Sequence, residues 1–504
     1  MLLNLRLLID KFAPRFMRPW IERLQRSPIA YRLARGTFWS LAGAVISRGL
    51  MLAASVVVAR ILGKGGFGEL GIIRSTVGMF GVLAGFGLGL TSTKHIAEFR
   101  DEEPERAGRI IGLSNLVAML TGGGMAVALV ISAPWLAAHS LNAPHLANIL
   151  RVGSLILFIN ALNGAQTGAL AGFEAFKEIA HVNLYAGLIS FPLMVGGACL
   201  GGVTGAVWAL AANLGINWLL NHVALRREAR RHGVAISWER SHGERHILWK
   251  FSLPAALSGI LVGPVKWICN ALLVNQDDGY AALGVLTATL AFQQLLVFAS
   301  GMLNAPLLSM ISNAGKKISR RLATVNILSS GILGVAVSLP ILWFPETAEV
   351  LFGKEFSGRS FRYALAFGML STCIMLYKQG VTRLLVARSY MWWGFLSNLI
   401  WALGVLGSAV YCVRFGAWGI ALAFYVGYVV NIVVYVPMAI RFRLVTREQL
   451  VSWPVLSVAV FLHVCAVLPV LVPSLLERFF LFCGMVLVVI LAVWVRVRQM
   501  RAVQ

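Results

Sequence analysis

Apolar runs long enough to cross a bilayer dominate this sequence. The first extends from Thr37 to Ile61, TFWSLAGAVISRGLMLAASVVVARI, and holds one charge near its middle, Arg48. About 20 apolar residues suffice for a helix to cross the hydrocarbon core. A charged side chain at that depth costs about 2.5 kcal/mol or more, so it normally faces a protein interior or a water-filled cavity. The run therefore predicts a membrane-spanning helix whose arginine faces the inside of the protein.

Composition agrees with a membrane protein that crosses the bilayer many times. Of the 504 residues, 58% are hydrophobic and only 13% are charged, whereas a soluble domain carries about 25% charged residues. The formal net charge is +24, but the basic residues lie mainly between apolar runs, as the positive-inside rule predicts. Nucleic-acid binding is therefore not expected. Residues 1–36 are too basic and too interrupted for a cleavable signal peptide, so we expect the first span to act as the signal.

Fourteen runs have the length of a membrane span, so the expected fold is an all-α polytopic membrane protein. Glycine, proline or charged residues separate them. The predicted spans cover residues 37–61, 69–93, 110–133, 147–170, 179–200, 204–224, 249–273, 280–304, 322–343, 361–384, 391–412, 418–439, 452–472 and 476–495. With the N-terminus in the cytoplasm, and with residues at the ends of spans counted in the adjoining loops, 32 of the 44 Lys and Arg residues fall on the cytoplasmic side, 7 on the opposite side and 5 within spans. Both termini are therefore expected in the cytoplasm.

A long basic loop divides the predicted spans into two sets of six. An internal repeat supports this division, because GFGELG at 66–71 aligns with GYAALG at 279–284. Each half has an even number of spans, so both halves enter the membrane from the same side, and two lobes are expected around a central cavity. The predicted parts are a basic amphipathic segment at 1–36, an N-lobe at 37–224, a basic linker at 225–248, a C-lobe at 249–440 and an extra helix pair at 451–495.

The charges embedded in the predicted spans, away from their ends, are all cationic, and none of the twenty acidic residues lies in the middle of a span. A cavity lined only by positive side chains favours an anionic passenger, and the arginine fork matches the oxygens of a diphosphate. A cation antiporter would instead be expected to bury Asp or Glu. The candidate diphosphate ligands are Arg48, Arg74 and Lys266.

Each of these cations also has a structural interpretation. Arg48 can bond backbone carbonyls between helices, and Arg74 is close enough to the end of its span to reach the surface. Lys266 can equally have a structural role. A fourth cation, Lys378, lies about six residues from the inner end of its span and is interpreted as reaching the membrane interface.

Polar uncharged residues on three spans are candidates for binding a glycan. Those on the fourth and sixth spans recur at helical spacing, which places them roughly on one face of each helix. The candidates are Asn160, Asn163, Gln166, Asn213, Asn217 and Gln293. Joining helices to one another is the commoner use of such residues, and the sequence leaves both roles open.

Metal, cofactor and enzyme signatures are absent from the sequence. The six cysteines are widely spaced and form neither a CxxC pair nor a cluster with histidine, so no metal site is expected. No Walker A loop, HExxH or GxSxG occurs in a suitable context. We therefore expect neither a cofactor nor an enzyme.

Two stretches resemble a known family. These are VVARILGKGGFGELG at 57–71 and LFGKEFSGRSFRYAL at 351–365. They resemble the polysaccharide-transport branch of the multidrug/oligosaccharidyl-lipid/polysaccharide exporter superfamily, which includes O-antigen and exopolysaccharide flippases. The resemblance implies a flippase that moves a polyprenyl-diphosphate-linked oligosaccharide across the bacterial inner membrane by alternating access. Lipid II flippases use arginines in their first two spans, which Arg48 and Arg74 resemble in placement.

The resemblance also implies partners and alternatives. The implied partners are the lipid-linked glycan, membrane lipids and other polysaccharide-assembly proteins. The first alternative is a multidrug or small-molecule antiporter of the same superfamily, against which the lack of buried acids counts. A membrane-bound glycan polymerase or transferase is a further alternative, but it would be favoured by a long periplasmic loop, and none is visible beyond 344–360.

Overall fold

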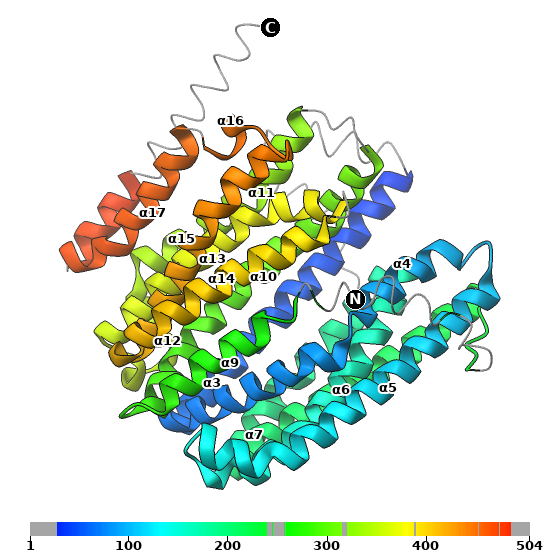
Figure 1. Cartoon of the computed structure of the whole chain (residues 1–504), viewed down its shortest axis with the longest axis horizontal. Coiled ribbons are helices and arrows are strands. Elements are labelled where there is room, and N and C mark those ends of the chain that lie inside the picture. The colour runs from blue at the N-terminus through cyan, green and yellow to red at the C-terminus, as the bar shows by residue number, and fades with distance from the viewer. Residues whose placement is uncertain are drawn as a thin grey trace, which may run out of the picture. The chain divides into compact units, whose positions relative to one another are not determined.

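The computed structural model describes residues 28–238, 244, 257, 259–314, 320–387, 390–451, 453–472 and 474–484. Within these ranges all regular structure is helical (Figure 1). Most of the predicted amphipathic segment, part of the predicted linker and the second half of the last predicted span lie outside the described residues. The expected all-α class is therefore confirmed for the part of the chain that the structure describes.

The chain forms two compact units. Unit 1 comprises residues 1–54, 83–131 and 151–256, and unit 2 comprises residues 55–82, 132–150 and 257–504. The first five α-helices described are α3 (Pro28–Gly85), α4 (Leu88–Phe99), α5 (Pro104–Trp135), α6 (Ala147–Gly172) and α7 (Phe176–Arg231). Of these, α3, α5 and α6 contribute residues to both units.

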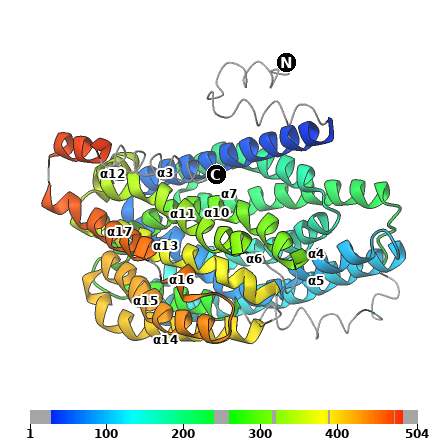
Figure 2. The same cartoon turned by 90° about the horizontal axis from the view of Figure 1, so that it is seen from above.

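The remaining elements belong to unit 2. They are η1 (Leu136–Ser140), η2 (Pro144–Leu146), α9 (Val262–Val274), α10 (Gly279–Ala314), α11 (Arg320–Trp343), α12 (Pro345–Phe352), η5 (Lys354–Phe356), α13 (Arg359–Ala387), α14 (Met391–Cys412), η6 (Val413–Phe415), α15 (Ala417–Arg441), α16 (Arg447–Leu450) and α17 (Trp453–Leu471). The long helices α13, α14 and α15 pack closely, and α14 and α15 lie side by side in both ribbon views (Figures 1 and 2). On its other sides α13 packs against α10 and α11.

Glycines allow two of the long helices to change direction. In α3 the backbone leaves the helical region at Gly63, whose φ is 66°. In α7 the break falls at Gly201 and Gly202, and Gly202 has a φ of 55°. Glycine adopts positive φ without the steric cost that a side chain brings. Each break lies between two predicted spans, so the residues predicted as spans one and two, and five and six, are joined by bent helices.

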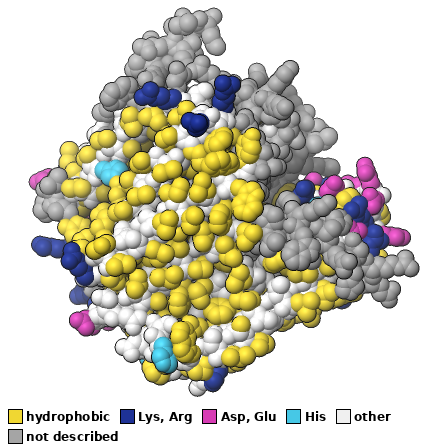
Figure 3. Space-filling model, viewed as in Figure 1, with side chains coloured by type: hydrophobic (Ala, Val, Ile, Leu, Met, Phe, Trp, Pro, Cys, Tyr) yellow, Lys and Arg dark blue, Asp and Glu magenta, His cyan; other side chains and the backbone are white. Residues whose placement is uncertain are grey.

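Nine helices among the described residues are long and apolar enough to cross a membrane. Two of them, 45–99 and 176–231, each contain two predicted spans, and two shorter apolar helices occur at 262–274 and 455–469. Hydrophobic side chains cover most of the face shown in Figure 3, while Lys and Arg gather toward its edges. The polytopic membrane fold is confirmed, but the expected count of fourteen spans is not.

Unit 2 is not the same set of residues as the predicted C-lobe. It also contains 55–82 and 132–150, which the sequence assigns to the N-lobe. The predicted lobes at 37–224 and 249–440 therefore remain a prediction.

The two copies of the sequence repeat contact each other inside unit 2. A Cβ atom added at Gly68 would lie 1.9 Å from the carbonyl oxygen of Tyr280, and one at Gly284 would lie 2.0 Å from the carbonyl oxygen of Lys64. Real side chains cannot approach so closely, so α3 and α10 can pack at this distance only with glycine in both places. The repeat thus marks a reciprocal helix contact.

The two stretches that resemble the exporter family also contact each other. Arg60 donates hydrogen bonds from Nε to the carbonyl oxygen of Leu351 (2.8 Å) and from Nη2 to that of Val350 (2.6 Å). These carbonyls lie at the C-terminal end of α12, where a cation is favourable. Phe67 packs with Phe352 at a ring-centroid distance of 6.3 Å. The resemblance therefore rests on residues that join two parts of unit 2.

Candidate functional site

Arg48 lies on α3 next to a close helix contact in unit 1. The hydroxyl of Ser47 donates to the carbonyl oxygen of Asn183 on α7 at 2.8 Å. A Cβ at Gly187 would lie 2.1 Å from the same hydroxyl. This contact sets the rotation of α3, and Arg48 is left exposed, with Nη1 3.8 Å from the sulfur of Met51.

Arg74 and Lys266 lie on adjacent helices of unit 2. Next to them in sequence, Asn270 donates from Nδ2 to Oγ of Ser75 at 2.9 Å, and Trp267 donates from Nε1 to Oγ1 of Thr76 at 3.0 Å. These bonds join α3 to α9, and both cationic side chains remain exposed. Two positive charges on adjacent helices favour an anionic ligand.

Two of the three predicted diphosphate ligands lie on adjacent helices. Arg48 belongs to unit 1, whereas Arg74 and Lys266 belong to unit 2. A single site that includes all three remains a prediction.

The buried acidic side chains of the described residues pair with arginines other than Arg48 and Arg74. The buried acids among the described residues are Glu228, Glu244 and Glu349, and each has an arginine partner. Glu228 is near the end of α7, and Glu349 is in the short helix α12. Glu69 also lies on α3, where its carboxylate is 3.0 Å from Nε2 of His145.

Four of the polar side chains on α6 and α7 form one hydrogen-bond network in unit 1. The amide of Asn221 donates to Oδ1 of Asn217 at 2.7 Å, to Oδ1 of Asn163 at 3.2 Å and to Oγ1 of Thr167 at 3.4 Å. Asn163 in turn donates to the carbonyl oxygen of Leu214 at 3.1 Å. This network joins the two helices, as the second interpretation of these residues expects.

The remaining glycan candidates have different surroundings. Gln166 is buried near His222, at 3.4 Å, and its amide in the other orientation makes two 3.1 Å bonds with Trp218. Asn213 is buried as well, and its Oδ1 has no partner among the described residues. Asn160 is exposed on α6.

Gln293 belongs to the other unit. It is partly buried on α10 and faces α13, because a Cβ at Gly368 would lie 2.7 Å from its Nε2. The candidates are thus divided between two units, and a common glycan site remains a prediction.

The interpretation of Lys378 as a side chain that reaches the interface is wrong. Its side chain on α13 is only 9% exposed, and Nζ donates to Oγ of Ser397 at 3.2 Å and to Oδ1 of Asn431. The ammonium group also lies 4.5 Å from the ring centroid of Tyr435, within cation–π range. Partners on α14 and α15 therefore retain the charge inside unit 2.

A second buried cation, Arg383, lies further along α13 and is 5% exposed. Its Nη1 donates to the carbonyl oxygen of Asn326 at 3.0 Å and to Oδ1 of the same residue at 3.1 Å, and Nη2 donates to Ser330. Sequence reasoning counted Arg383 with the cytoplasmic loop because it is at the end of a predicted span. Asn326 and Ser330 are polar residues within a predicted span, and they were the sequence feature that could have indicated a buried partner for Arg383.

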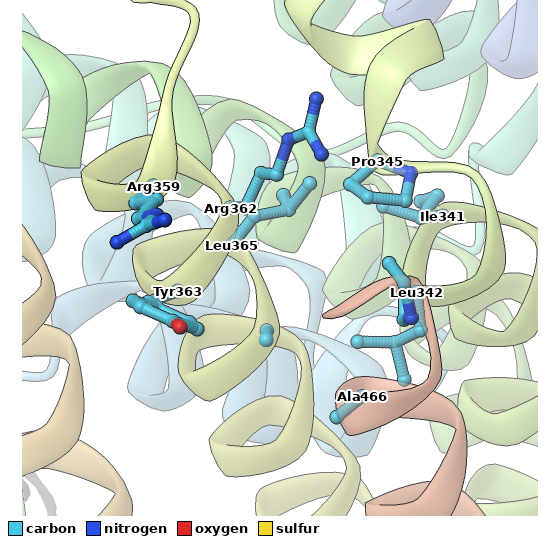
Figure 4. Close-up of a pocket in the computed structure, with 10 residues that line it drawn as sticks. Ile341, Leu342, Pro345, Arg359, Arg362, Tyr363, Leu365 and Ala466 are labelled. Atoms are coloured by element: carbon cyan, nitrogen blue, oxygen red, sulfur yellow. The ribbon is translucent and has the colours of Figure 1, made fainter. Parts of the chain in front are cut away.

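A pocket of about 190 Å³ occurs where α11, α13 and α17 meet, at the start of α12. Arg359 and Arg362 line it on α13, and Ala466 lines it on α17 (Figure 4). None of the predicted site residues lines this pocket.

Two acid–arginine pairs lie beside the pocket. Arg362 donates to both carboxylate oxygens of Glu349, at 2.8 and 2.9 Å, and Arg478 donates to both of Glu346, at 2.8 and 3.1 Å. Burial alone raises the pKa of Glu346, but the hydrogen bond from Arg478 and the charges of Arg478 and Arg362 outweigh it. The pKa therefore lies below its ordinary value, and the carboxylate is ionised at neutral pH.

Comparison with protein families and curated proteins identifies polysaccharide exporters as relatives. Residues 33–247 match the family model described as polysaccharide biosynthesis protein. The chain is 24% identical over 408 residues to the EPS I polysaccharide export inner membrane protein EpsE of Ralstonia nicotianae, which covers 77% of this chain and 89% of the relative. It is 23% identical over 256 residues to the lipid III flippase of Escherichia coli strain K12, covering 50% of this chain and 60% of the relative.

Solved structures of the same fold come from transporters. An inward-facing multidrug resistance MATE family transporter of the MOP superfamily matches with a TM-score of 0.64 and 17% identity, covering 79% of this chain and 98% of that chain. Lipid II flippase MurJ, in an inward closed conformation, matches with a TM-score of 0.60 and 13% identity, covering 86% and 98%. The family model confirms the resemblance to polysaccharide exporters over residues 33–247. A curated relative confirms it over most of the chain.

Proposed function

We propose that this protein is a flippase that moves a polyprenyl-diphosphate-linked oligosaccharide across the bacterial inner membrane by alternating access. The observation that carries the proposal is the similarity to an exopolysaccharide export protein over 77% of the chain. The charge pattern of the sequence supports it, because Arg48, Arg74 and Lys266 lie within predicted spans that hold no acid near their middle, and the proposed passenger is an anion.

Arg48, Arg74 and Lys266 are the proposed ligands of the diphosphate. All three side chains are exposed, and the two in unit 2 lie on helices held together by hydrogen bonds. An arginine fork matches the oxygens of a phosphate group, and a lysine adds a point charge. The glycan would contact the exposed amide of Asn160 or the polar residues of α6, α7 and α10, and the prenyl tail would stay in lipid.

Both termini are proposed to lie in the cytoplasm. The excess of Lys and Arg on one side of the predicted spans supports this orientation. Membrane lipids and other polysaccharide-assembly proteins are the proposed partners.

A multidrug or small-molecule antiporter is the weaker candidate. The MATE structure supports only a shared fold at 17% identity. By name, the curated relatives are a polysaccharide export protein and a lipid III flippase. None of the twenty acidic residues lies in the middle of a predicted span.

The proposal can be tested with purified protein in proteoliposomes that contain a fluorescent polyprenyl-diphosphate oligosaccharide. The rate of lipid flipping would be compared among the wild type, Arg48→Ala, Arg48→Lys and the control Lys354→Ala, which changes an exposed lysine outside the proposed site. We expect Arg48→Ala to reduce the rate about tenfold or more, because a hydrogen bond to a charged group contributes about 1.5–3 kcal/mol. Arg48→Lys should retain more activity than Arg48→Ala.

The outcomes separate the claims. If wild type and Arg48→Ala move the lipid equally well, Arg48 is not a diphosphate ligand. If the wild type moves none of a panel of polyprenyl-diphosphate glycans but exports cationic drugs, the antiporter is the correct assignment.

A further inference from the structure

The pocket at the ends of α11, α13 and α17 combines a cationic rim with an apolar wall. Its apolar lining includes Ile341 and Leu342 of α11 and Leu365 of α13. Ala466 and Pro469 of α17 complete the wall. Figure 4 shows the guanidinium group of Arg362 directed away from Ala466, toward the end where the polypeptide leaves the helices. One pocket therefore has a polar end and an apolar end.

Three arginines and two acidic residues lie around this pocket, so one positive charge is not balanced by an acid. Glu346 and Glu349 carry two negative charges, and the guanidinium groups of Arg362 and Arg478 balance them. Arg478 is 1% exposed and also donates to the carbonyl oxygen of Trp343, so its position is tightly defined. These four side chains form a neutral cluster.

Arg359 is the cation that remains. It is exposed at the first position of α13, and among the described residues it has neither a hydrogen bond nor an ion pair. Because it lines the same pocket as the apolar wall, an anion bound to it could also contact that wall.

Aromatic residues indicate that this end of unit 2 lies at a membrane–water interface. Tyr363 on the first turns of α13 packs against Trp418 of α15 at a centroid distance of 5.9 Å, and both side chains are partly exposed. Trp and Tyr are enriched at the level of lipid headgroups. Beyond the pocket, Phe479 and Phe480 are exposed apolar side chains, as expected of a surface covered by lipid.

We propose that this pocket binds the headgroup of an anionic phospholipid, with its phosphate on Arg359 and the start of an acyl chain on the apolar wall. A guanidinium group and phosphate oxygens form charge-assisted hydrogen bonds. The wall favours an amphiphile over a free phosphate ion, because only the amphiphile buries apolar surface there. The proposal is independent of the transport assignment, since none of the proposed diphosphate or glycan ligands lines the pocket.

The test measures which lipids stay with the protein. The full-length chain would be reconstituted in nanodiscs with equal amounts of phosphatidylglycerol and phosphatidylcholine of matched chains, and the retained lipids counted by native mass spectrometry. We expect the wild type to favour phosphatidylglycerol about fivefold at this site, the factor expected for one basic residue near an anionic lipid surface. Arg359→Gln should abolish that preference, and Arg359→Lys should retain most of it.

Arg414→Gln is the matched control, because Arg414 is an exposed arginine beside Phe415 in the loop between α14 and α15. An equal loss of preference in this variant, or none in Arg359→Gln, would overturn the proposal. Two competitors identify the occupant. Displacement by inorganic phosphate alone would show a simple anion site, and preferential displacement by polyprenyl diphosphate would assign the pocket to the transported lipid; either result contradicts the phospholipid assignment.

Discussion

At the scale of single residues, the buried ammonium group of Lys378 has neutral partners. Ser397 and Asn431 accept its hydrogen bonds, and Asn431 is itself oriented by donating to the carbonyl oxygen of Ser397 at 2.6 Å. The rings of Tyr435 and Tyr428 lie 4.5 and 6.0 Å from Nζ. A charge in such surroundings is stabilised only as long as each dipole stays in place.

We therefore predict strong coupling between Lys378 and Asn431. Asn431→Leu removes the main acceptor and should destabilise the protein by about 3 kcal/mol, because it leaves a buried charge unpaired. Lys378→Met should cost less, and the double variant should be more stable than Asn431→Leu alone. Unfolding of the purified protein in detergent, followed by tryptophan fluorescence, would measure this double-mutant cycle. Additive effects, within about 0.5 kcal/mol, would show that the two side chains act independently.

At the scale of elements, close backbone packing joins α3 to α10. Two positions have no room for a larger side chain, since Cβ atoms at Gly68 and Gly284 would lie 1.9 and 2.0 Å from backbone carbonyl oxygens of the facing helix. Membrane helices approach closely where small residues line the contact. The bonds from Arg60 to the end of α12 reinforce the same region.

Gly68→Ala should separate these helices. Its methyl group would meet the carbonyl oxygen of Tyr280, and overpacking of this kind costs about 1–3 kcal/mol. Gly78→Ala is the matched control on the same helix, because a Cβ there has no other atom within 4 Å, and it should be neutral or slightly stabilising. The unfolding temperature in detergent measures both variants. Equal unfolding temperatures would mean that the helices can adjust to the methyl group at no cost.

At the scale of the whole molecule, the contact between α3 and α10 joins residues of the predicted N-lobe to residues of the predicted C-lobe. Alternating access requires the two lobes to separate on one side of the membrane at a time. A contact of this kind is therefore expected to break once in each transport cycle.

A disulfide can test this expectation. A Cβ at Gly71 would lie 3.4 Å from Cβ of Thr287, close to the spacing of about 3.5–4.5 Å in disulfides. Gly71→Cys with Thr287→Cys, in a background where the exposed Cys199 and Cys483 are serine, should stop lipid flipping after oxidation and recover it after reduction. The controls are the Thr287→Cys single variant and the reduced double variant, because Gly71→Cys alone would place its Cβ 2.4 Å from Oγ1 of Thr287. Unchanged flipping in fully cross-linked protein would show that this contact persists throughout the cycle.

The membrane fold class, and the expectation that the charges inside it are positive, follow from the amino-acid sequence alone. Both depend on local properties: the length of apolar runs such as 37–61, and the presence of Arg48 or Lys266 within them. A bilayer imposes the same length and charge requirement on any helix that crosses it, whatever its neighbours.

The hydrogen-bond partners of individual polar side chains are visible in the tertiary structure and not in the sequence. Lys378 is retained inside unit 2 by Ser397 and Asn431, and Arg383 by Asn326, all on other helices. Hydrogen bonds between helices depend on which faces meet, and the spacing of residues along one helix does not define this. For the same reason the sequence could name Arg74 and Lys266 separately, while the bonds between α3 and α9 determined that they lie on adjacent helices.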